Sequence, residues 1–412
     1  MSVNSKKTGS VFGGALLITG SCVGAGMLGL PILSGLAGLG PALIMFTVAW
    51  LFMTLTSLLL VEANSWFPKQ VNLLSMVDHA LGKVGKNICL VTYLFLFYAL
   101  LVAYVSASGG LFSSLLYNVY GISFSSWLGS LLFVVIFGLV VYRGTRRVDL
   151  WNRVLMVGKI FFFLALVLIG SKYIQPKLLS RSHFSLSFFA LPILITSFGF
   201  HNMVPSLTAY FHKDLKKVRT SIFIGGLFAF FIYLLWEILV LGIVPLEGSH
   251  GLLETYRLDQ EGSQALSSII GSAWIQLFAQ GLAFFAILTS FLAQSLSFVH
   301  FLADGFKVSS EKKESAFLCF LALAPPLLLS IIYPKLFFRA LDFAGGICAV
   351  LLFGVLPALT VWIGRYHKKS SVSYRVPGGK GILVFILIFS IAIFLFETLI
   401  LSDVFSIWKM NP

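Results

Sequence analysis

The chain has 412 residues, of which 58% are hydrophobic and 11% are charged, and its mean hydropathy is +0.97. Because soluble domains carry roughly 25% charged residues, this composition excludes a soluble globular protein. The net charge of +14 does not indicate nucleic acid as a partner, since the basic residues lie in short clusters between apolar runs, where they orient a membrane protein. We expect membrane lipid around nearly the whole chain.

The apolar segments predict an all-α integral membrane protein, because a helix needs roughly 20 apolar residues to cross a bilayer. Eleven transmembrane helices are expected, at residues 11–34, 42–62, 88–116, 128–142, 152–171, 184–208, 220–246, 265–303, 316–334, 340–364 and 382–402. Segment 265–303 is too long for one upright span. Gly271 and Trp274 predict its division into a short outer helix and a tilted span.

Numbering the spans separates the loops into two sets with unequal positive charge. One set holds 21 lysines and arginines and the other holds 7, while Lys159 lies within a span. The positive-inside rule then places the amino terminus in the cytoplasm and the carboxyl terminus outside. The expected units are a cytoplasmic tail (1–10), a first group of five helices (11–171), a second group of five (184–364), and an eleventh helix with an outer tail (382–412).

The first span is rich in glycine at its middle. Gly20, Gly24 and Gly26 each weaken a helix by about 1 kcal/mol relative to alanine. Irregular backbone at this depth is tolerated only where it lines a cavity or packs in protein, so we expect a break between Cys22 and Gly26. Tight helix packing through Gly20-x-x-x-Gly24 is the alternative interpretation.

The sixth span has a similar polar centre. Its middle holds Ser197, Gly199 and His201 between two prolines, Pro192 and Pro205. The first and sixth spans each open a group of five, and because five is odd, the two groups have opposite orientations. Interrupted spans at corresponding places in inverted repeats indicate the midplane site of a transporter.

The run from Gly20 to Leu28 followed by Pro31, together with the run from Ser197 to Asn202, resembles the bacterial hydroxy and aromatic amino acid permeases of the amino acid-polyamine-organocation superfamily. The tyrosine-specific permeases are the most similar, and the resemblance covers nearly the whole chain. It implies a LeuT-type 5+5 inverted repeat with broken helices 1 and 6, and proton-coupled uptake. These motifs do not separate tyrosine from tryptophan or serine permeases.

An amino acid zwitterion requires one site for its carboxylate and one for its ammonium group. The start of the second half of span 1 offers N–H groups to the carboxylate, and the ends of the preceding half-helices offer carbonyls to the ammonium group. The nominated substrate-binding residues are Thr19, Gly20, Ser21, Cys22, Gly24, Ala25 and Gly26 in span 1, and Ser197 and Gly199 in span 6.

Specificity must then come from a side-chain pocket. Phe198, Phe200, Tyr98 and Tyr104 are candidates for stacking on an aromatic substrate, although most aromatic residues in such a chain face lipid or other helices. His201 is a candidate for donating to a tyrosine hydroxyl or for carrying a proton. A packed, neutral core histidine is the alternative.

Lys159 is the candidate for proton coupling, because a buried ammonium group is costly and needs a partner. Other transporters of this fold hold sodium between the first broken span and hydroxyls of span 8, and here Thr289 and Ser290 would supply the hydroxyls. A lysine that snorkels to the inner surface is the alternative.

Four carboxylates lie in or near the spans. Glu62 and Glu397 lie at helix ends and are expected at the membrane interfaces, while Glu237 and Asp342 are candidates for a gate or a proton path.

The predicted function is secondary active transport that imports aromatic amino acids, tyrosine first, by proton symport with alternating access across a bacterial inner membrane. A serine, threonine or other neutral amino acid permease, or sodium coupling, is possible with the same fold, and a channel is the alternative from another class. We expect neither an enzyme nor a cofactor or metal site. The sequence contains no HExxH or Walker motif, and Cys22, Cys89, Cys319 and Cys348 have no CxxC spacing.

Overall fold

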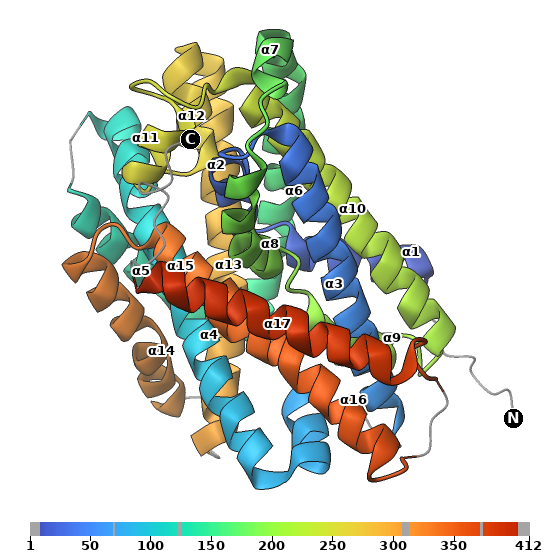
Figure 1. Cartoon of the computed structure of the whole chain (residues 1–412). Helices are drawn as coiled ribbons and strands as arrows, with labels where there is room; N and C mark the ends of the chain where they lie inside the picture. Colours follow the sequence, from blue (N-terminus) through green and yellow to red (C-terminus); the bar gives the residue numbers. More distant parts are fainter. Residues whose placement is uncertain (1–8, 69–70, 122–124, 307–312, 371–373, 403–412) are drawn as a thin grey trace, which may run out of the picture.

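The computed structural model describes residues 9–68, 71–121, 125–306, 313–370 and 374–402, and within these ranges the chain forms helices and no strands (Figure 1). The first half contains α1 (Val11–Cys22), α2 (Gly26–Ser34), α3 (Leu39–Ser65), α4 (Leu73–Tyr120), α5 (Ser126–Tyr142), α6 (Thr145–Gly170) and α7 (Pro176–Leu179). The second half contains η2 (Phe184–Ala190), α8 (Leu191–Ser197), η3 (His201–Met203), α9 (Val204–Tyr210), α10 (Leu215–Ile243), α11 (Leu252–Arg257), α12 (Gly262–Ile270), α13 (Ala273–Phe306), α14 (Lys313–Ile332), α15 (Phe337–Asp342), the π-helix η4 (Phe343–Val355), α16 (Leu356–Tyr366) and α17 (Gly379–Leu401).

The described residues include eight helical segments that are long and apolar enough to cross a membrane. A bent pair, α1 with α2, meets the same criterion jointly, and α5 and residues 316–332 are shorter apolar helices. Each predicted apolar segment overlaps one of these elements. The all-helical membrane fold is therefore confirmed, whereas the number of crossings stays a prediction.

Two glycines with left-handed backbone interrupt the helices. Gly271, with a φ of 63°, separates α12 from α13, so the predicted division of segment 265–303 is confirmed. Gly82, with a φ of 68°, bends α4 sharply after its first turns. Glycine adopts this conformation without the steric cost that a Cβ brings.

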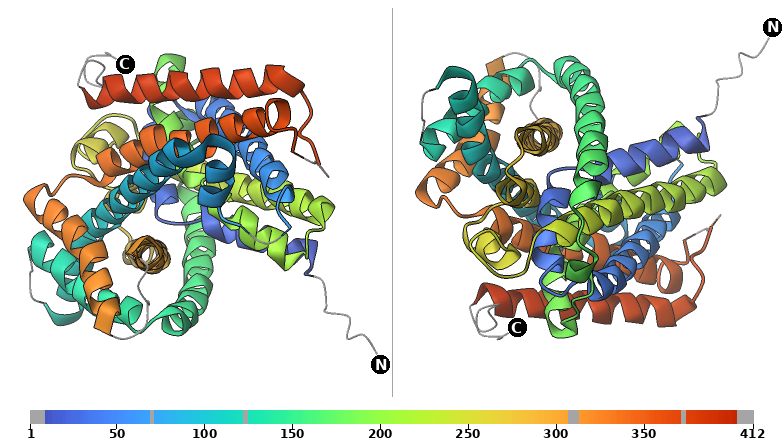
Figure 2. Two further views of the ribbon diagram at one scale, coloured as in Figure 1. Left: turned by 90° about the horizontal axis from the view of Figure 1, so that it is seen from below. Right: turned by 90° about the horizontal axis from the view of Figure 1, so that it is seen from above.

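The helix α13 lies at the centre of one side of the bundle. Figure 2 shows it along its axis, with α4, α5, α6 and α14 around it, and it contacts each of these four helices. On the other side, α10 packs against α1 and α3, and η4 packs against α8 and α17. The two interrupted spans, which contain α1 and α8, thus pack mainly against helices of this second group.

Glu62, in the last turn of α3, lies in a buried ion pair, while its expected depth at a membrane interface stays a prediction. The side chains of Glu62 and Arg365 are both 0% exposed. The Arg365 guanidinium donates through Nε and Nη2 to the two carboxylate oxygens, at 2.6 and 2.5 Å, and the N–H of Val376 donates to Oε2 at 2.7 Å. This pair ties α3 to α16 and to the segment that leads into α17.

Glu62→Ala is expected to lower the stability of the protein by about 3–5 kcal/mol, because it leaves the Arg365 charge buried and unpaired. Thermal unfolding in detergent measures the loss. Asp78→Asn is the matched control, since the Asp78–Lys86 pair is partly exposed and such pairs contribute about 0–1 kcal/mol. Equal melting temperatures for the two variants would contradict the assignment.

Two carboxyl groups organise the connection between α10 and α13. Asp259 accepts the N–H groups of Phe337 and Phe338, at 2.7 and 3.1 Å, at the start of α15. Glu261 accepts the N–H and the hydroxyl of Ser263, at 2.7 and 2.6 Å, at the start of α12. Burial raises the pKa of Asp259 to about 6 and the pKa of Glu261 to about 7, against the hydrogen bonds, which lower both.

These raised pKa values predict that stability falls as the pH rises from about 4 to about 7. Over that range the two carboxyl groups ionise in the unfolded chain before they ionise in the native protein, so the unfolded state is progressively favoured. Melting temperatures across this range measure the slope. Asp259→Asn and Glu261→Gln should each flatten it, and an unchanged slope in both variants would contradict this account.

Candidate functional site

The first interruption lies between α1 and α2. The helix α1 ends at Cys22, α2 begins at Gly26, and their axes are bent by 65°. A Cβ on Gly24 would lie 2.5 Å from the Ser290 hydroxyl oxygen. The break therefore falls where the glycines predict it, and glycine allows α13 to approach the backbone there.

The second interruption lies between α8 and α9. The helix α8 ends at Ser197, residues 198–200 leave the helix, and the short η3 precedes α9, which begins at Val204. Both interruptions that the sequence predicts are thus present.

A tyrosine of α10 joins the two breaks. The Tyr233 hydroxyl lies 2.7 Å from the carbonyl oxygen of Cys22 and 2.8 Å from that of Ser197, so it hydrogen-bonds at the ends of both α1 and α8. A Cβ on Gly26 would lie 3.0 Å from the Ser197 hydroxyl oxygen. Sequence reasoning missed Tyr233, because one tyrosine in an apolar span carries no distinguishing pattern.

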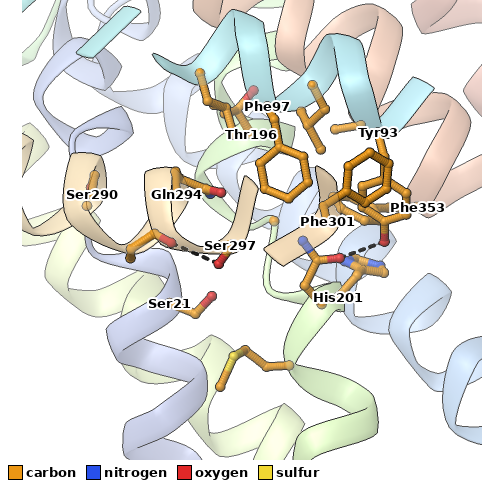
Figure 3. A pocket seen from close by; sticks show the side chains of 18 of the residues that line it. Ser21, Tyr93, Phe97, Thr196, His201, Ser290, Gln294, Ser297, Phe301 and Phe353 are labelled. Carbon is orange, nitrogen blue, oxygen red and sulfur yellow. Dashed lines mark hydrogen bonds between the residues drawn. The ribbon is translucent and has the colours of Figure 1, made fainter. Parts of the chain in front are cut away.

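A cavity of about 920 Å³ lies beside the breaks. Its wall includes Gly20, Ser21, Cys22, Gly24, Ala25 and Gly26 from the first break, and Ser197, Gly199 and His201 from the second. The helices α4 and α13 supply much of the remaining wall (Figure 3). The cavity extends to the helix ends at Asn72, Lys86 and Asp304. It therefore reaches one side of the helix bundle.

Five aromatic side chains line the cavity: Tyr93, Phe97, Tyr104, Phe301 and Phe353. Four of these gather with His201 at one end in Figure 3. Of the five, the sequence nominated Tyr104 alone. Positions 93, 97, 100 and 104 of α4 all line the cavity, and this spacing of three and four residues, which marks one helix face, is the signal that could have found the others.

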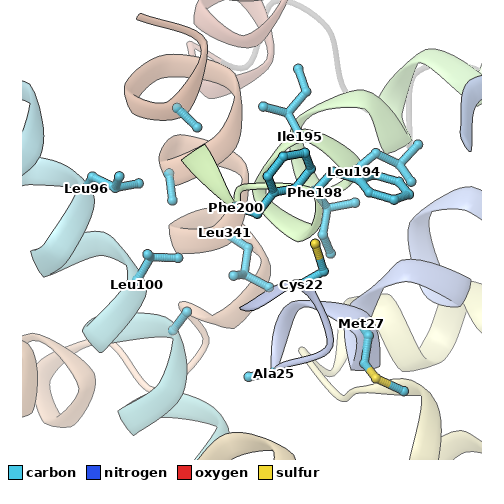
Figure 4. Packing of buried hydrophobic residues seen from close by; sticks show 14 of the residues in the cluster. Cys22, Ala25, Met27, Leu96, Leu100, Leu194, Ile195, Phe198, Phe200 and Leu341 are labelled. Atoms are coloured by element: carbon cyan, nitrogen blue, oxygen red, sulfur yellow. The ribbon is translucent and has the colours of Figure 1, made fainter. Parts of the chain in front are cut away.

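Three nominated aromatic residues lie outside the cavity lining. Figure 4 shows Phe198 and Phe200 within the apolar cluster that also holds Cys22 and Leu194. Phe198 packs edge-on against Tyr233, and the Tyr98 hydroxyl donates to the carbonyl of Leu321. Because the chain leaves the helix at Phe198, the Phe198 and Phe200 side chains lie in the core and not in the lining of this cavity.

Thr19 also lies outside the cavity lining. Its hydroxyl shares one proton between the carbonyl oxygens of Ala15, at 2.9 Å, and Gly225, at 3.0 Å, and its own carbonyl accepts the N–H of Val23. These bonds fasten α1 to α10. Thr19 is thus a packing residue in this structure.

His201 lines the cavity and is also packed. Its ring stacks on Phe353, with centroids 4.6 Å apart, and on Phe200, with centroids 5.4 Å apart. Nε2 lies 2.9 Å from the Thr56 hydroxyl, whereas Nδ1 has no hydrogen-bond partner among the described residues.

The three residues nominated for coupling come together at the cavity. Lys159 is 3% exposed, and its ammonium group donates to the carbonyl oxygen of Val23 at 2.5 Å. Ser290 accepts the N–H of Ala25 at 2.9 Å, and Thr289 lines the cavity beside it. The lysine therefore contacts the first break and does not snorkel to a surface.

The helices define a membrane protein with a cavity beside two interrupted spans. Residues 7–397 match the tryptophan/tyrosine permease family, and the chain belongs to this family. The chain is 31% identical to a tryptophan-specific transport protein of Haemophilus influenzae, with 94% of this chain and 95% of the relative covered. It is likewise 31% identical to tyrosine-specific transport system 1 of the same organism (92% and 94% covered) and 30% identical to a tryptophan-specific transport protein of Pseudomonas aeruginosa (93% of each). The chain is thus an integral membrane permease and not an enzyme.

Proposed function

We propose that this permease imports an aromatic amino acid, tyrosine first, across a bacterial inner membrane by proton symport with alternating access. The proposal rests on the place where the two helix breaks meet. Tyr233 bonds the ends of α1 and α8 there, and the break residues Cys22 and Ser197 line a cavity that also holds five aromatic side chains. Backbone groups at helix breaks suit a zwitterion, and aromatic rings suit an aromatic side chain.

The hydrogen bonds at the breaks indicate which backbone groups are free to bind the carboxylate and the ammonium group of the substrate. The N–H of Ala25 is already bonded to Ser290, so we assign the carboxylate to the N–H groups of Gly24 and Gly26 at the start of α2. The carbonyls of Cys22 and Ser197 share the single proton of the Tyr233 hydroxyl, and we therefore assign the ammonium group to the carbonyls of Gly20 and Ser21.

The substrate ring belongs at the aromatic end of the cavity, against Tyr93, Phe97, Phe301 and Phe353. Asn202 accepts the Tyr93 hydroxyl at 2.7 Å there, which supplies a polar group near the ring site. His201 is the second polar group at this end of the cavity. A phenolic hydroxyl would find hydrogen-bonding groups at this end.

The helix contacts support eleven crossings arranged as an inverted repeat. The first and seventh spans meet through α1 and α10, and their repeat counterparts, the sixth and second, meet through α8 and α3. The fifth and eighth spans meet through α6 and α13, and their counterparts, the tenth and third, meet through η4 and α4. With the amino terminus in the cytoplasm, the cavity would open inward.

The Lys159 contact supports proton coupling. Its ammonium group contacts the Val23 carbonyl at the first break, and the α13 hydroxyls of Thr289 and Ser290 line the same cavity, so a positive charge is present where a coupling cation would otherwise be needed. A titrating lysine there supplies or withdraws positive charge as it gains or loses a proton.

Tyrosine and tryptophan are expected to compete for uptake of labelled tyrosine more strongly than serine or leucine. Each aromatic contact contributes about 0.5–1.5 kcal/mol, which is roughly two- to tenfold in affinity. Competition in proteoliposomes measures this preference. Phe97→Leu should weaken the preference, whereas Tyr98→Phe should preserve it, because Tyr98 lies outside the cavity. Stronger competition by serine would favour a hydroxy amino acid permease instead.

A further inference from the structure

Two carboxyl groups lie deep in the protein, away from the cavity. Asp342 is the last residue of α15, directly before η4, and Glu397 lies on α17. Glu397 is 0% exposed and Asp342 is 8% exposed. The Glu397 side chain is turned toward η4, while its expected depth at a membrane interface stays a prediction.

The two carboxyl groups share one face of η4. A Cβ on Gly346 would lie 2.4 Å from Cγ of Glu397 and 2.9 Å from its carboxyl carbon, so the Glu397 side chain rests directly on this glycine. Asp342 precedes Gly346 by four residues, about one helical turn. Because Glu397 rests on Gly346 and Asp342 lies one turn before this glycine, the two side chains lie near each other.

In the part of the chain that the structure describes, no cationic side chain pairs with either carboxyl group. Both oxygens of Glu397 and Oδ1 of Asp342 are buried without a hydrogen-bond partner among the described residues. Within the same residues, neither group forms an ion pair, in contrast to Glu62 with Arg365. The ionisable groups of other elements near Asp342 are Tyr256 of α11 and Asp259, and Asp259 adds negative charge. Arg339, on the same helix as Asp342, is exposed.

Two unpaired anions side by side in a low-dielectric interior are strongly unfavourable. A proton held between two carboxyl groups removes one charge and gives each group a hydrogen-bond partner, as O–H···O⁻. We propose that Asp342 and Glu397 form a proton-binding site in which the two carboxyl groups share one proton.

The same segment of η4 also holds α8. A Cβ on Gly345 would lie 1.8 Å from the carbonyl oxygen of Pro192, and the Thr196 hydroxyl donates to the carbonyl of Leu341 at 3.2 Å. Adjacent glycines thus pack η4 against α8 and against Glu397. Loss of the shared proton would make the two carboxylates repel, displace α17 from η4, and loosen the support of α8, which ends at the second break. This consequence rests on the proposed function, whereas the proton site does not.

Infrared difference spectroscopy of the full-length protein in liposomes tests the site directly. The wild type should show a C=O stretching band of a protonated carboxyl group that shifts in D₂O and that the Asp342→Asn/Glu397→Gln double variant lacks. Each single variant should move this band, because the remaining acid has a new partner. Glu237→Gln is the matched control for a second buried carboxyl group, which bonds Ser34 through Oε1 while its Oε2 has no partner among the described residues. This variant should lose at most the band of Glu237 itself and leave the band of the Asp342–Glu397 pair in place.

A double variant with the wild-type carboxyl bands would overturn the proposal. Loss of the band when sodium replaces potassium would also overturn it, because the pair would then hold a cation rather than a proton. The proposed function is tested separately, by uptake of aromatic amino acids by the wild type. If that uptake is absent, the proposed function is wrong, but the infrared bands still test the proton site.

Discussion

Gly24→Val is expected to abolish substrate binding while the protein still inserts and folds. The new side chain would begin 2.5 Å from the Ser290 hydroxyl oxygen and would fill the space at the N–H groups assigned to the carboxylate. Overpacking alone costs about 1–3 kcal/mol, and each 1.4 kcal/mol lowers affinity about tenfold, so the lost carboxylate contacts should bring binding below detection. Binding of labelled tyrosine to purified protein measures the effect.

Gly110→Val is the matched control, because Gly110 of α4 lies outside the cavity lining and a Cβ there would meet nothing within 4 Å. Gly26→Val should behave as Gly24→Val does, since its Cβ would lie 3.0 Å from the Ser197 hydroxyl oxygen. Wild-type binding by both valine variants would contradict the carboxylate assignment.

Lys159→Ala is expected to abolish accumulation against a gradient while largely preserving substrate binding. The lysine holds the Val23 carbonyl at the first break, and its charge is the one that we expect to titrate during transport. The variant should therefore equilibrate substrate across the membrane without concentrating it. Uptake and binding, measured side by side in proteoliposomes, separate the two effects.

Arg153→Ala provides the control for Lys159, since Arg153 lies on the same helix in an exposed pair with Asp149. It should accumulate substrate normally. Full proton-driven accumulation by Lys159→Ala would remove this lysine from the mechanism and make His201 the next residue to test.

The features that the sequence predicted well are those with a local physical cause. Glycines and prolines weaken a helix wherever they occur, so the breaks at Cys22–Gly26 and after Ser197 could be located from the sequence alone. A lone ammonium group in an apolar span must find an acceptor, and Lys159 does so at the first break.

The features that the sequence did not predict depend on how distant segments pack. The Phe198 ring points into the core because the chain leaves the helix at this residue. Helical periodicity in the sequence does not predict the direction of a side chain outside the helix. Position at a helix end suggested that Glu62 and Glu397 are interfacial. The Glu62 side chain is buried because Val376 and Arg365 cover it, and the Glu397 side chain is buried because it rests on η4. Neither contact follows from position along the helix.

Uptake of labelled tyrosine into proteoliposomes, with proton and sodium gradients imposed separately, tests the central claim most directly. An acidic exterior without sodium should drive accumulation, and unlabelled tryptophan should suppress it. Accumulation that requires a sodium gradient, or the absence of any uptake of aromatic amino acids under either gradient, would contradict the account.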